Sequence, residues 1–574
     1  MPHHPPPATG AVLQPLASAL IDTGQAPDSA DELFSLGLAL ADEEQWAAAA
    51  IAFQRVEQLK PESSASYNHG TCLSNAGKYE EALSAFEHFL QYHPDDAAAL
   101  NNRGAALRLL ERHEEALADF SRSLELRFDD AATLMNRGIA LADVGRHEEA
   151  RADFDHALAV RPDHPDTLIN RGITLAELGR HDEALADYNR SLELRPDDAD
   201  AMNNRGNVLC RLGRYDEALA DYNRALDLVP DDPDTLMNRG ITLGRLERHE
   251  EALADYDRAL QLRPDHPDTL NNRGASLGKL ERYGEALADL ERSLELRPDH
   301  ANVLNNRGNA LHGLGRDQEA LIDYDQALKR LPDDADFLYN RGNSLISLHR
   351  HEEALVDFSR SLELRPDHAP TLFKRGNALY KLDRYEDALT DYDRAVELRP
   401  DDADTMNNRG NVLSSMGRHD EALAAYNRSL QLDPDDVGIM TNRSTVLGIL
   451  GRHEETLAAL NRVLELQPNR GPTLNGIAIS LDHLHRSDES LQMYKRAIDV
   501  EPQEVLYRLN RATLETKLGD PLAAQADLDS ALENGDLENF RRESAGTARE
   551  HAYFEPLRAN PSLLDTFNRI LGSA

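Results

Sequence analysis

The sequence predicts an all-α solenoid, in which short helix pairs stack one on the next. Two observations predict this fold class. The triplet Asn-Arg-Gly recurs every 34 residues, at 102–104, 136–138, 170–172, 204–206, 238–240 and onward to 408–410, with Lys374 replacing the Asn once. A proline recurs at the same spacing from Pro162 to Pro502. A fixed period of this size is typical of architectures in which every repeat is one small unit of secondary structure.

Each period contains two amphipathic helices. In residues 199–232, the first apolar stripe ends at Gly213, a residue that commonly stops a helix. The second stripe begins at Asp216-Glu217, where acids favour a first helical turn, and Pro230 ends it. Helices of about twelve residues are marginal alone in water, so stacking between repeats must supply the stability.

The composition limits both the core and the partners. The chain has 574 residues, of which 40% are hydrophobic and 5% aromatic, so it forms a core and builds it from Ala and Leu. Lys and Arg total 62 against 102 Asp and Glu, which gives a formal net charge of −40. Because such a surface repels phosphate backbones and anionic lipids, we expect neither nucleic acid nor a membrane as partner.

Cysteine content and apolar runs indicate a cytoplasmic setting. The two cysteines, Cys72 and Cys210, are too few for a disulfide framework. No run approaches eighteen apolar residues, and the first residues lack the basic and apolar segments of a signal peptide.

Six positions of the repeat carry a resemblance to a known family. With Ala97 as position 1, small residues stand at positions 8 and 27, Leu at 11, Ala at 20, an aromatic residue at 24 and usually Pro at 32. This pattern resembles the tetratricopeptide-repeat family. Gly104 and Ala116 are expected where the two helices approach most closely, with Phe120 filling the space beside them. The resemblance implies a right-handed superhelical solenoid.

The resemblance divides the chain into three parts. About fifteen repeats fill residues 30–538. Residues 1–29 form an N-terminal flank, which we expect to be disordered over residues 1–10 with a short cap at Ala11–Asp22, and residues 539–574 form C-terminal capping helices. The array also resembles the repeat region of O-linked N-acetylglucosamine transferases, without the catalytic domain that follows there.

No motif for catalysis, cofactor or metal is apparent. His recurs at repeat position 17, for example as His181 and His249, but no His-Glu-x-x-His occurs and Tyr replaces it freely, as at Tyr215. We therefore predict a packing role for position 17, no bound cofactor or metal, and no enzymatic activity. The flanks are too short for a catalytic domain.

In the family, the first helix of each repeat lines a concave groove, and position 6 faces it. That position forms a ladder of amides: Asn102, Asn136, Asn170, Asn204, Asn238, Asn272, Asn306, Asn340, Lys374, Asn408 and Asn442. An amide both donates and accepts hydrogen bonds, so the ladder is predicted to hold an extended peptide by its backbone. Alternatively, each Asn satisfies neighbouring backbone groups while the Arg that follows it pairs with nearby acids.

Variable groove positions would supply specificity. A basic stripe consists of Arg211, Arg245 and Lys279, and an aromatic and basic cluster consists of Tyr339, Phe373, Lys374, Tyr380 and Lys381. Aromatic anchors beside cations are common at interface hot spots. The predicted function is a scaffold for proteins or extended peptides, with no small-molecule substrate. The alternatives are a substrate-recruiting subunit of a separately encoded enzyme, such as a glycosyltransferase, and a structural spacer.

Overall fold

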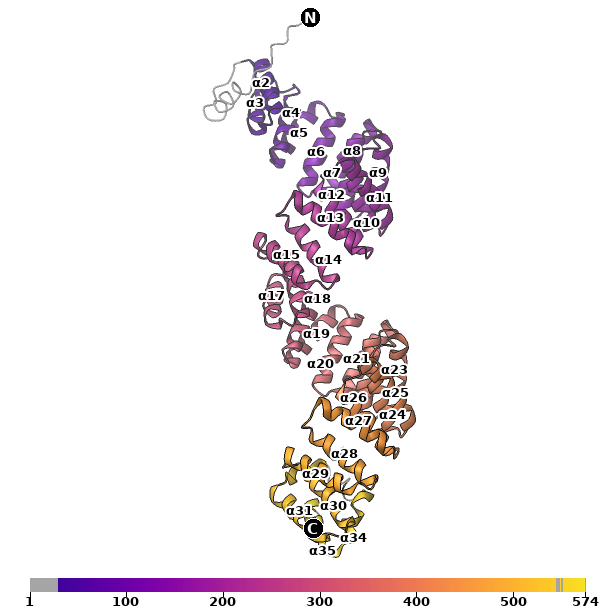
Figure 1. Cartoon of the computed structure of the whole chain (residues 1–574). Helices are drawn as coiled ribbons and strands as arrows, with labels where there is room; N and C mark the ends of the chain where they lie inside the picture. The colour runs from indigo at the N-terminus through magenta and orange to yellow at the C-terminus, as the bar shows by residue number, and fades with distance from the viewer. Residues whose placement is uncertain (1–28, 544–547, 549–550, 573–574) are drawn as a thin grey trace. The chain divides into compact units, whose positions relative to one another are not determined.

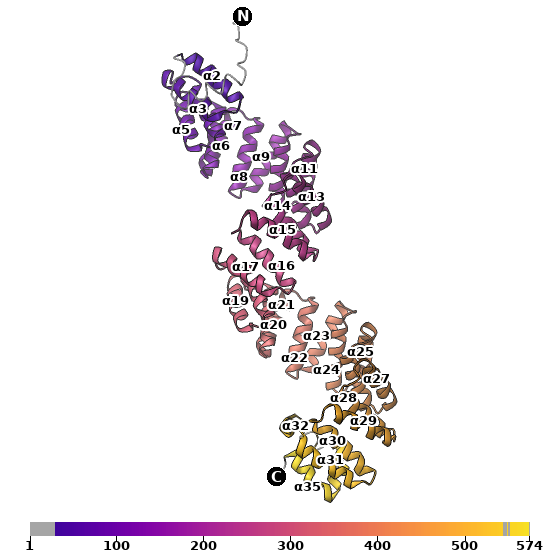
Figure 2. The same cartoon turned by 60° about the vertical axis from the view of Figure 1, so that its left-hand side comes forward.

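The computed structural model describes residues 29–543, 548 and 551–572, and every regular element in these residues is a helix. Consecutive helices pack in antiparallel pairs, and within each of two units every pair packs on its neighbours in sequence, as Figures 1 and 2 show. The predicted all-α solenoid of helix pairs is therefore confirmed. The disorder predicted for residues 1–10 and the cap predicted at Ala11–Asp22 lie outside the described residues.

The chain divides into two compact units, one ending at Leu296 and the other beginning at Arg297. The first unit contains α2 (Ala30–Asp42), α3 (Trp46–Leu59), α4 (Ala65–Asn75), α5 (Tyr79–Tyr92), α6 (Ala97–Leu109), α7 (His113–Leu126), α8 (Ala131–Asp143), α9 (His147–Val160), α10 (Pro165–Glu177), α11 (His181–Leu194), α12 (Ala199–Arg211), α13 (Tyr215–Leu228), α14 (Pro233–Arg245), α15 (His249–Leu262), α16 (Pro267–Lys279) and α17 (Tyr283–Leu296).

The second unit continues the same alternation and ends in shorter helices. It contains α18 (Ala301–Gly313), α19 (Asp317–Arg330), α20 (Ala335–Ser347), α21 (His351–Leu364), α22 (Ala369–Lys381), α23 (Tyr385–Leu398), α24 (Ala403–Ser415), α25 (His419–Leu432), α26 (Val437–Ile449), α27 (His453–Leu466), α28 (Gly471–His483), α29 (Ser487–Val500), α30 (Val505–Lys517), α31 (Pro521–Asn534), α32 (Leu537–Glu543), the 3-10 helix η1 (Ala552–Phe554), α34 (Glu555–Ala559) and α35 (Pro561–Leu571).

The two helices of a repeat meet at a glycine. In the α12–α13 pair, a Cβ atom added to Gly206 would lie 2.7 Å from Cε1 of Tyr222, which is 1% exposed. The expected contact between Gly104 and Phe120 has the same form, with 2.8 Å to Cε1. Since real Cβ atoms do not approach a ring so closely, the glycine is required by packing.

Polar side chains and glycines set the helix ends. The side chain of Asp198 accepts a hydrogen bond from the N–H of Ala201 at 2.9 Å and so caps the start of α12. At the other end, Gly213 adopts a φ of +75°, in the left-handed region that glycine enters without strain. Similar side-chain caps recur in many repeats, and the turn between the two helices has a positive φ at Gly in some repeats and at Glu, Asp or His in others. Helix lengths of thirteen and fourteen residues recur along most of the chain.

The C-terminal helices pack onto the last repeat. Helix α35 lies against α31, and α34 lies against α30. Leu557, Phe567 and Ile570 are fully buried in a cluster that also contains Leu528 of α31. Apolar residues beyond the repeats thus cover the open side of the final helix pair, which would otherwise face water.

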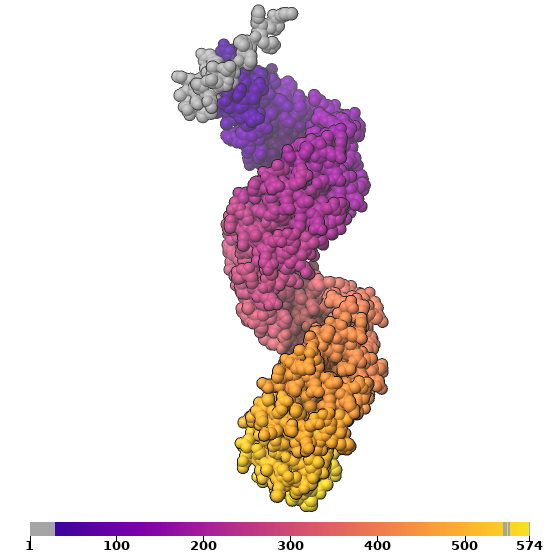
Figure 3. Space-filling model, in the orientation of Figure 1, coloured from indigo at the N-terminus to yellow at the C-terminus, as the bar shows by residue number. Residues whose placement is uncertain are grey.

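The first helices of successive repeats also touch one another within each unit. Such contacts join α6 to α8, α8 to α10, α12 to α14, α20 to α22 and α28 to α30. We call the surface that these helices share the first-helix surface. Figure 3 shows how the helix pairs of each unit merge into a continuous surface on the visible face.

Candidate functional site

The predicted Asn ladder lies along the first-helix surface, and most of its members bind the preceding repeat. Nδ2 of Asn238 in α14 donates to Oδ1 of Asn203 in α12 at 3.1 Å. The same bond between repeat positions 6 and 5 links Asn136 to Asn101 (2.9 Å), Asn340 to Asn305 (3.0 Å), Asn442 to Asn407 (3.1 Å) and Asn510 to Asn475 (2.9 Å). Each amide is therefore held in position by a neighbouring amide.

The remaining members have other surroundings. Asn102 donates to the hydroxyl of Tyr67 at 3.1 Å, Asn408 donates to Oδ1 of Asn377 at 3.0 Å, and Asn170 donates to the carbonyl of Asp166 at 2.8 Å. Asn204, Asn272, Asn306 and Lys374 occupy the same position and are half-buried. Asn170 therefore binds a backbone group, as the alternative interpretation of the ladder predicts. Most of the other ladder amides donate to side chains instead.

The arginine after the ladder Asn ties the two helices of its repeat together. Nε and Nη2 of Arg205 donate to the two carboxylate oxygens of Asp221, each at 2.6 Å, and Nη1 donates to Asn189 of the preceding repeat at 2.7 Å. Asp221 is 5% exposed. This part of the alternative is confirmed. The same pairing joins Arg103–Asp119, Arg137–Asp153, Arg171–Asp187, Arg239–Asp255, Arg273–Asp289, Arg307–Asp323, Arg341–Asp357, Arg375–Asp391 and Arg511–Asp527.

These pairs stabilise the charged form of the arginine. At Arg171, the hydrogen bond to Asp187 raises the pKa of the guanidinium, and the charge of Asp155 adds to the effect. A bidentate pair of this kind fixes the rotation of the first helix about its axis. The pairs therefore set the direction in which the preceding Asn faces.

The predicted basic stripe lies in the last turns of three successive first helices. Arg211, Arg245 and Lys279 end α12, α14 and α16, and all three are exposed. Nη2 of Arg211 lies 3.4 Å from Oε1 of Glu177 in the previous repeat, which partly neutralises that end of the stripe.

The predicted aromatic cluster is divided by the fold. Tyr339 packs on Phe358 with ring centroids 6.1 Å apart, and Phe373 packs on Tyr392 at 6.2 Å, so both rings contribute to their own helix pairs. Tyr380 and Lys381 instead line a pocket of about 520 Å³. The other residues of that pocket include Ile346, Asn377 and Asn408, so it opens onto the first-helix surface.

The recurring histidines begin the second helices. Among the described residues, Nδ1 is buried without a hydrogen-bond partner in His113, His147, His181, His249, His351, His419 and His453.

The part of the chain that the structure describes contains no group of three His, Cys, Asp or Glu side chains placed to hold a metal ion. In the same residues, no helix has the length and apolar character needed to span a membrane.

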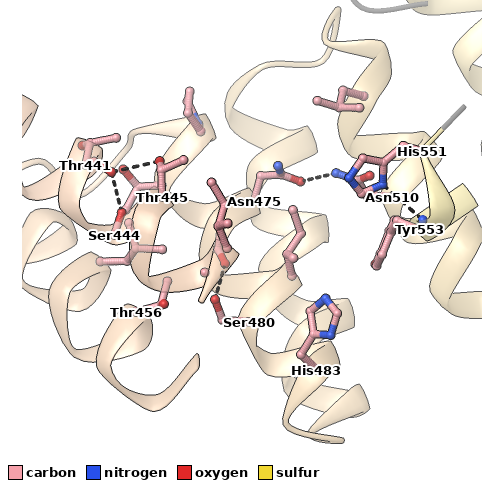
Figure 4. Close-up of a pocket in the computed structure, with 18 of the residues that line it drawn as sticks. Thr441, Ser444, Thr445, Thr456, Asn475, Ser480, His483, Asn510, His551 and Tyr553 are labelled. Carbon is pink, nitrogen blue, oxygen red and sulfur yellow. Dashed lines mark hydrogen bonds between the residues drawn. The ribbon is translucent and has the colours of Figure 1, made fainter. Parts of the chain in front are cut away.

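One pocket was not predicted from the sequence. It has a volume of about 600 Å³ and is lined by residues of α26, α27, α28 and α30 and by Ala548, His551, Tyr553 and Phe554, which come from beyond the repeats. Figure 4 shows Asn475 and Asn510 on one side of it, with His551 and Tyr553 beside them. The signal available in the sequence was Gly476, which interrupts the ladder between Asn442 and Asn510.

Family models assign the repeats. Models described as tetratricopeptide repeats match residues 67–132, 129–197, 170–233, 203–267, 265–333, 335–368 and 373–437. No curated protein matches the chain. The resemblance to the repeats of O-linked N-acetylglucosamine transferases stays a prediction.

Solved structures with similar folds come from several proteins. The APC/C hetero-tetramer Cut9-Hcn1 is 15% identical, with 87% of this chain and 98% of that chain covered and a TM-score of 0.42. A tetratricopeptide repeat protein from Parabacteroides merdae is 20% identical, with 43% and 98% covered and a TM-score of 0.37. YrrB, described as a TPR protein with an unusual peptide-binding site, is 28% identical, with 33% and 97% covered and a TM-score of 0.28. With seven matched segments spanning residues 67–437 almost without a gap, the chain belongs to the tetratricopeptide-repeat family.

Proposed function

We propose that this chain is a non-catalytic scaffold that binds extended peptide segments along its first-helix surface. Tetratricopeptide repeats indicate a role in protein interaction generally. The observation that carries the proposal is the row of amides held side by side. In the part of the chain that is described, Asn238 uses one N–H for Asn203, and its Oδ1 has no partner.

A peptide backbone offers the groups that such amides need. Each peptide unit presents one N–H and one C=O, and an Asn side chain pairs with either. Because neighbouring amides already hold the ladder in place, little side-chain entropy is lost when a peptide binds. With each net hydrogen bond contributing about 1 kcal/mol, the affinity is spread over many repeats and depends little on the peptide sequence.

Charge narrows the choice of partner. The net charge of −40 disfavours strongly acidic proteins over most of the surface. The exposed stripe of Arg211, Arg245 and Lys279 offers a local exception, and it selects a peptide with acidic residues opposite α12, α14 and α16. Tyr380 and Lys381 offer a second selective contact, for an aromatic or acidic side chain, at the pocket in the second unit.

Photo-crosslinking with displayed peptides tests this proposal. A benzophenone amino acid replaces Ile241, which is half-buried on the first helix α14, or Ala254, which is exposed on the second helix α15. The intact chain is then exposed to a phage-displayed library of random peptides. We expect peptides to crosslink at position 241 and not at 254. Equal crosslinking at both positions, or no enriched peptide, would contradict the proposal.

The accessory-subunit alternative predicts a different result. If the chain recruits substrates for a separately encoded enzyme, such as a glycosyltransferase, that enzyme must form a stable complex with it. Purification of the intact chain from its native cells, followed by mass spectrometry, would then recover the enzyme in a fixed ratio. Peptides bound without any enzyme partner favour the scaffold.

A further inference from the structure

The pocket of about 520 Å³ in the second unit forms where the ladder changes its bonding. In the next repeat the ladder amide donates to an Asn at position 5 of the repeat before it, as Asn442 does to Asn407 at 3.1 Å. Phe373 occupies position 5 in α22, so Asn408 donates instead to Oδ1 of Asn377 at 3.0 Å. Asn377 and Asn408 both line the pocket.

Asn377 presents an oriented hydrogen-bond donor to this pocket. Its Oδ1 accepts from Asn408 and also from the hydroxyl of Tyr392 at 2.6 Å. An amide oxygen has two lone pairs, so these two bonds occupy both and fix the orientation of the amide. Nδ2 makes no hydrogen bond within the described residues, and it is not buried. The N–H groups of Asn377 are therefore free to donate to a ligand.

A pair of hydroxyls offers a second donor. The hydroxyl of Tyr380 lies 3.3 Å from Oγ of Ser415 in the next first helix. Only one of their two hydrogens lies between the two oxygens, so the other hydrogen is left for a ligand. Ser415 is exposed and Tyr380 is half-buried.

Lys381 supplies a charge without a counter-ion. Its side chain is exposed at the end of α22, and its Nζ forms no ion pair with a described residue. The lining residues include no Asp or Glu, and the acid nearest to Lys381 in the sequence, Asp383, accepts a hydrogen bond from Tyr385 at 2.6 Å. The chain has only eight lysines, and Lys374 lies two turns earlier on the same helix. In a chain with a net charge of −40, such a site attracts anions locally.

We propose that this pocket binds an anionic side chain, a carboxylate or a phosphate, of a peptide held on the first-helix surface. This inference rests on the proposed function. Lys381, Asn377 and the hydroxyl pair all offer donors, and the oxygens of a carboxylate or phosphate accept from each of them. A lysine side chain has no acceptor, and a glutamine amide brings one acceptor oxygen but no charge for Lys381.

Lys279 provides a matched reference within the same chain. It ends α16 at the repeat position that Lys381 has in α22, and both side chains are exposed. Beside it, Ala275 and Gly278 stand where α22 has the amide and the phenol. Attraction by charge alone therefore acts at both lysines, whereas the additional donors are present only at Lys381.

Lysine-specific NMR on the intact chain tests the proposal. Reductive methylation with labelled formaldehyde marks each lysine and keeps its charge, and Lys381→Gln and Lys279→Gln assign the two signals. The probes are the α-amides of N-acetyl-glutamate and N-acetyl-phosphoserine, with that of N-acetyl-glutamine as the neutral counterpart. We expect the Lys381 signal to saturate at a concentration at least fivefold lower than the Lys279 signal, with an anionic probe and not with the neutral one. The probe that saturates first identifies a carboxylate or a phosphate as the preferred group.

Two results would overturn the proposal. Equal saturation at Lys381 and Lys279 would mean that charge attraction alone operates. Absence of a response at Lys381 to both anionic probes would mean that the pocket binds no anion.

Variants of the uncharged donors locate the binding. Asn377→Ala and Tyr380→Phe should each raise the saturating concentration at Lys381 several-fold and leave the Lys279 signal unchanged. Asn207→Ala is the matched control, because Asn207 accepts the same bond from Tyr222 at 2.8 Å in the first unit. It should change nothing at Lys381. Unchanged saturation in both pocket variants would contradict the proposal.

The crosslinking experiment separates this inference from the proposed function. Crosslinking of displayed peptides at position 241 takes place in the first unit and does not involve Lys381. If peptides crosslink at 241 but Lys381 does not prefer the anionic probes, only this inference fails. If Lys381 prefers them but no peptide crosslinks, the proposed function fails and the pocket is left as a site for free anions.

Discussion

The repeats from α6 to α17 and the repeats from α24 to α27 carry the same Asn-Arg pair but hold it differently. In α12 and α13, Arg205 is tied to the buried Asp221 by two hydrogen bonds of 2.6 Å. In the α24–α25 repeat, Ala425 occupies the position of Asp221, and Arg409 bonds instead to Asp393 of the preceding repeat at 2.6 Å. In the α26–α27 repeat, Ala459 occupies that position, and Arg443 bonds to Asn427 at 2.6 Å.

The same stretch departs from the pattern in its core. Ser444 replaces the glycine at position 8, and Leu460 replaces the aromatic residue that would collide with it. Close to these changes the ladder is interrupted at Gly476 and the 600 Å³ pocket opens. Regular repeats thus present a uniform row of amides, whereas the irregular repeats interrupt that row and leave a pocket beside it.

The largest expected effect is overpacking in a regular repeat. Gly206→Leu forces a side chain into the ring of Tyr222 and should destabilise the first unit by about 3 kcal/mol. Ser444→Ala, at the same repeat position in the irregular stretch, should cost less than about 1 kcal/mol. Hydrogen exchange of amides in α12, α13, α26 and α27 measures both. Equal effects would mean that the two regions pack alike.

The second largest expected effect is the loss of the Arg205–Asp221 ion pair. Asp221→Ala leaves a half-buried guanidinium without its acid, and we expect a loss of about 2 kcal/mol. Ala425→Asp makes the opposite change by offering Arg409 a carboxylate, and it should stabilise its repeat by about 1 kcal/mol or less. Denaturant titration of both variants measures whether the free energy of unfolding falls in Asp221→Ala and rises in Ala425→Asp. Destabilisation by Ala425→Asp would show that the irregular repeat has packed differently around the alanine.

The last repeat carries an acid where the regular repeats have a core leucine. Burial, and then the charge of Asp527, raise the pKa of Glu515 to about 7. Because the folded state holds this proton at a pH where the unfolded state releases it, stability falls as the pH rises from about 5 to 7. Glu515→Leu should remove that dependence and stabilise the repeat by about 1 kcal/mol at neutral pH. Thermal melts at several pH values test this, and a pH profile unchanged by the substitution would contradict it.

The smallest expected effect is a single change in the ladder. Asn238→Ala removes one bond to Asn203, on a half-buried surface, and should change the stability of the first unit by less than about 1 kcal/mol. Peptide affinity should fall by less than about tenfold. Isothermal titration with a selected peptide measures this change. A larger loss of affinity would show that binding is concentrated at one repeat.

Much of the fold could be predicted because its signals are local. The helix pairs follow from the 34-residue period, and the contact of Gly104 with Phe120 follows from residue size at fixed positions. The Arg205–Asp221 pair was not identified as a specific contact, because a spacing of sixteen residues shows which groups face each other only after the two helices are packed. The pocket could not be predicted at all, since Ala548, His551, Tyr553 and Phe554 complete its lining, and their position is not specified by any repeat.

The central claim is that the Asn ladder binds peptides instead of supporting the fold. Replacing Asn136, Asn170, Asn204 and Asn238 together with alanine tests it within one unit. If each contributes about 1 kcal/mol to binding, peptide affinity falls roughly a thousandfold while the melting temperature moves little. Leu226→Ala, which creates a cavity in the core beside the second helix α13, is the control with the opposite signature, losing stability but binding peptide while folded. A quadruple variant that unfolds readily, yet binds peptide normally when folded, would contradict the account.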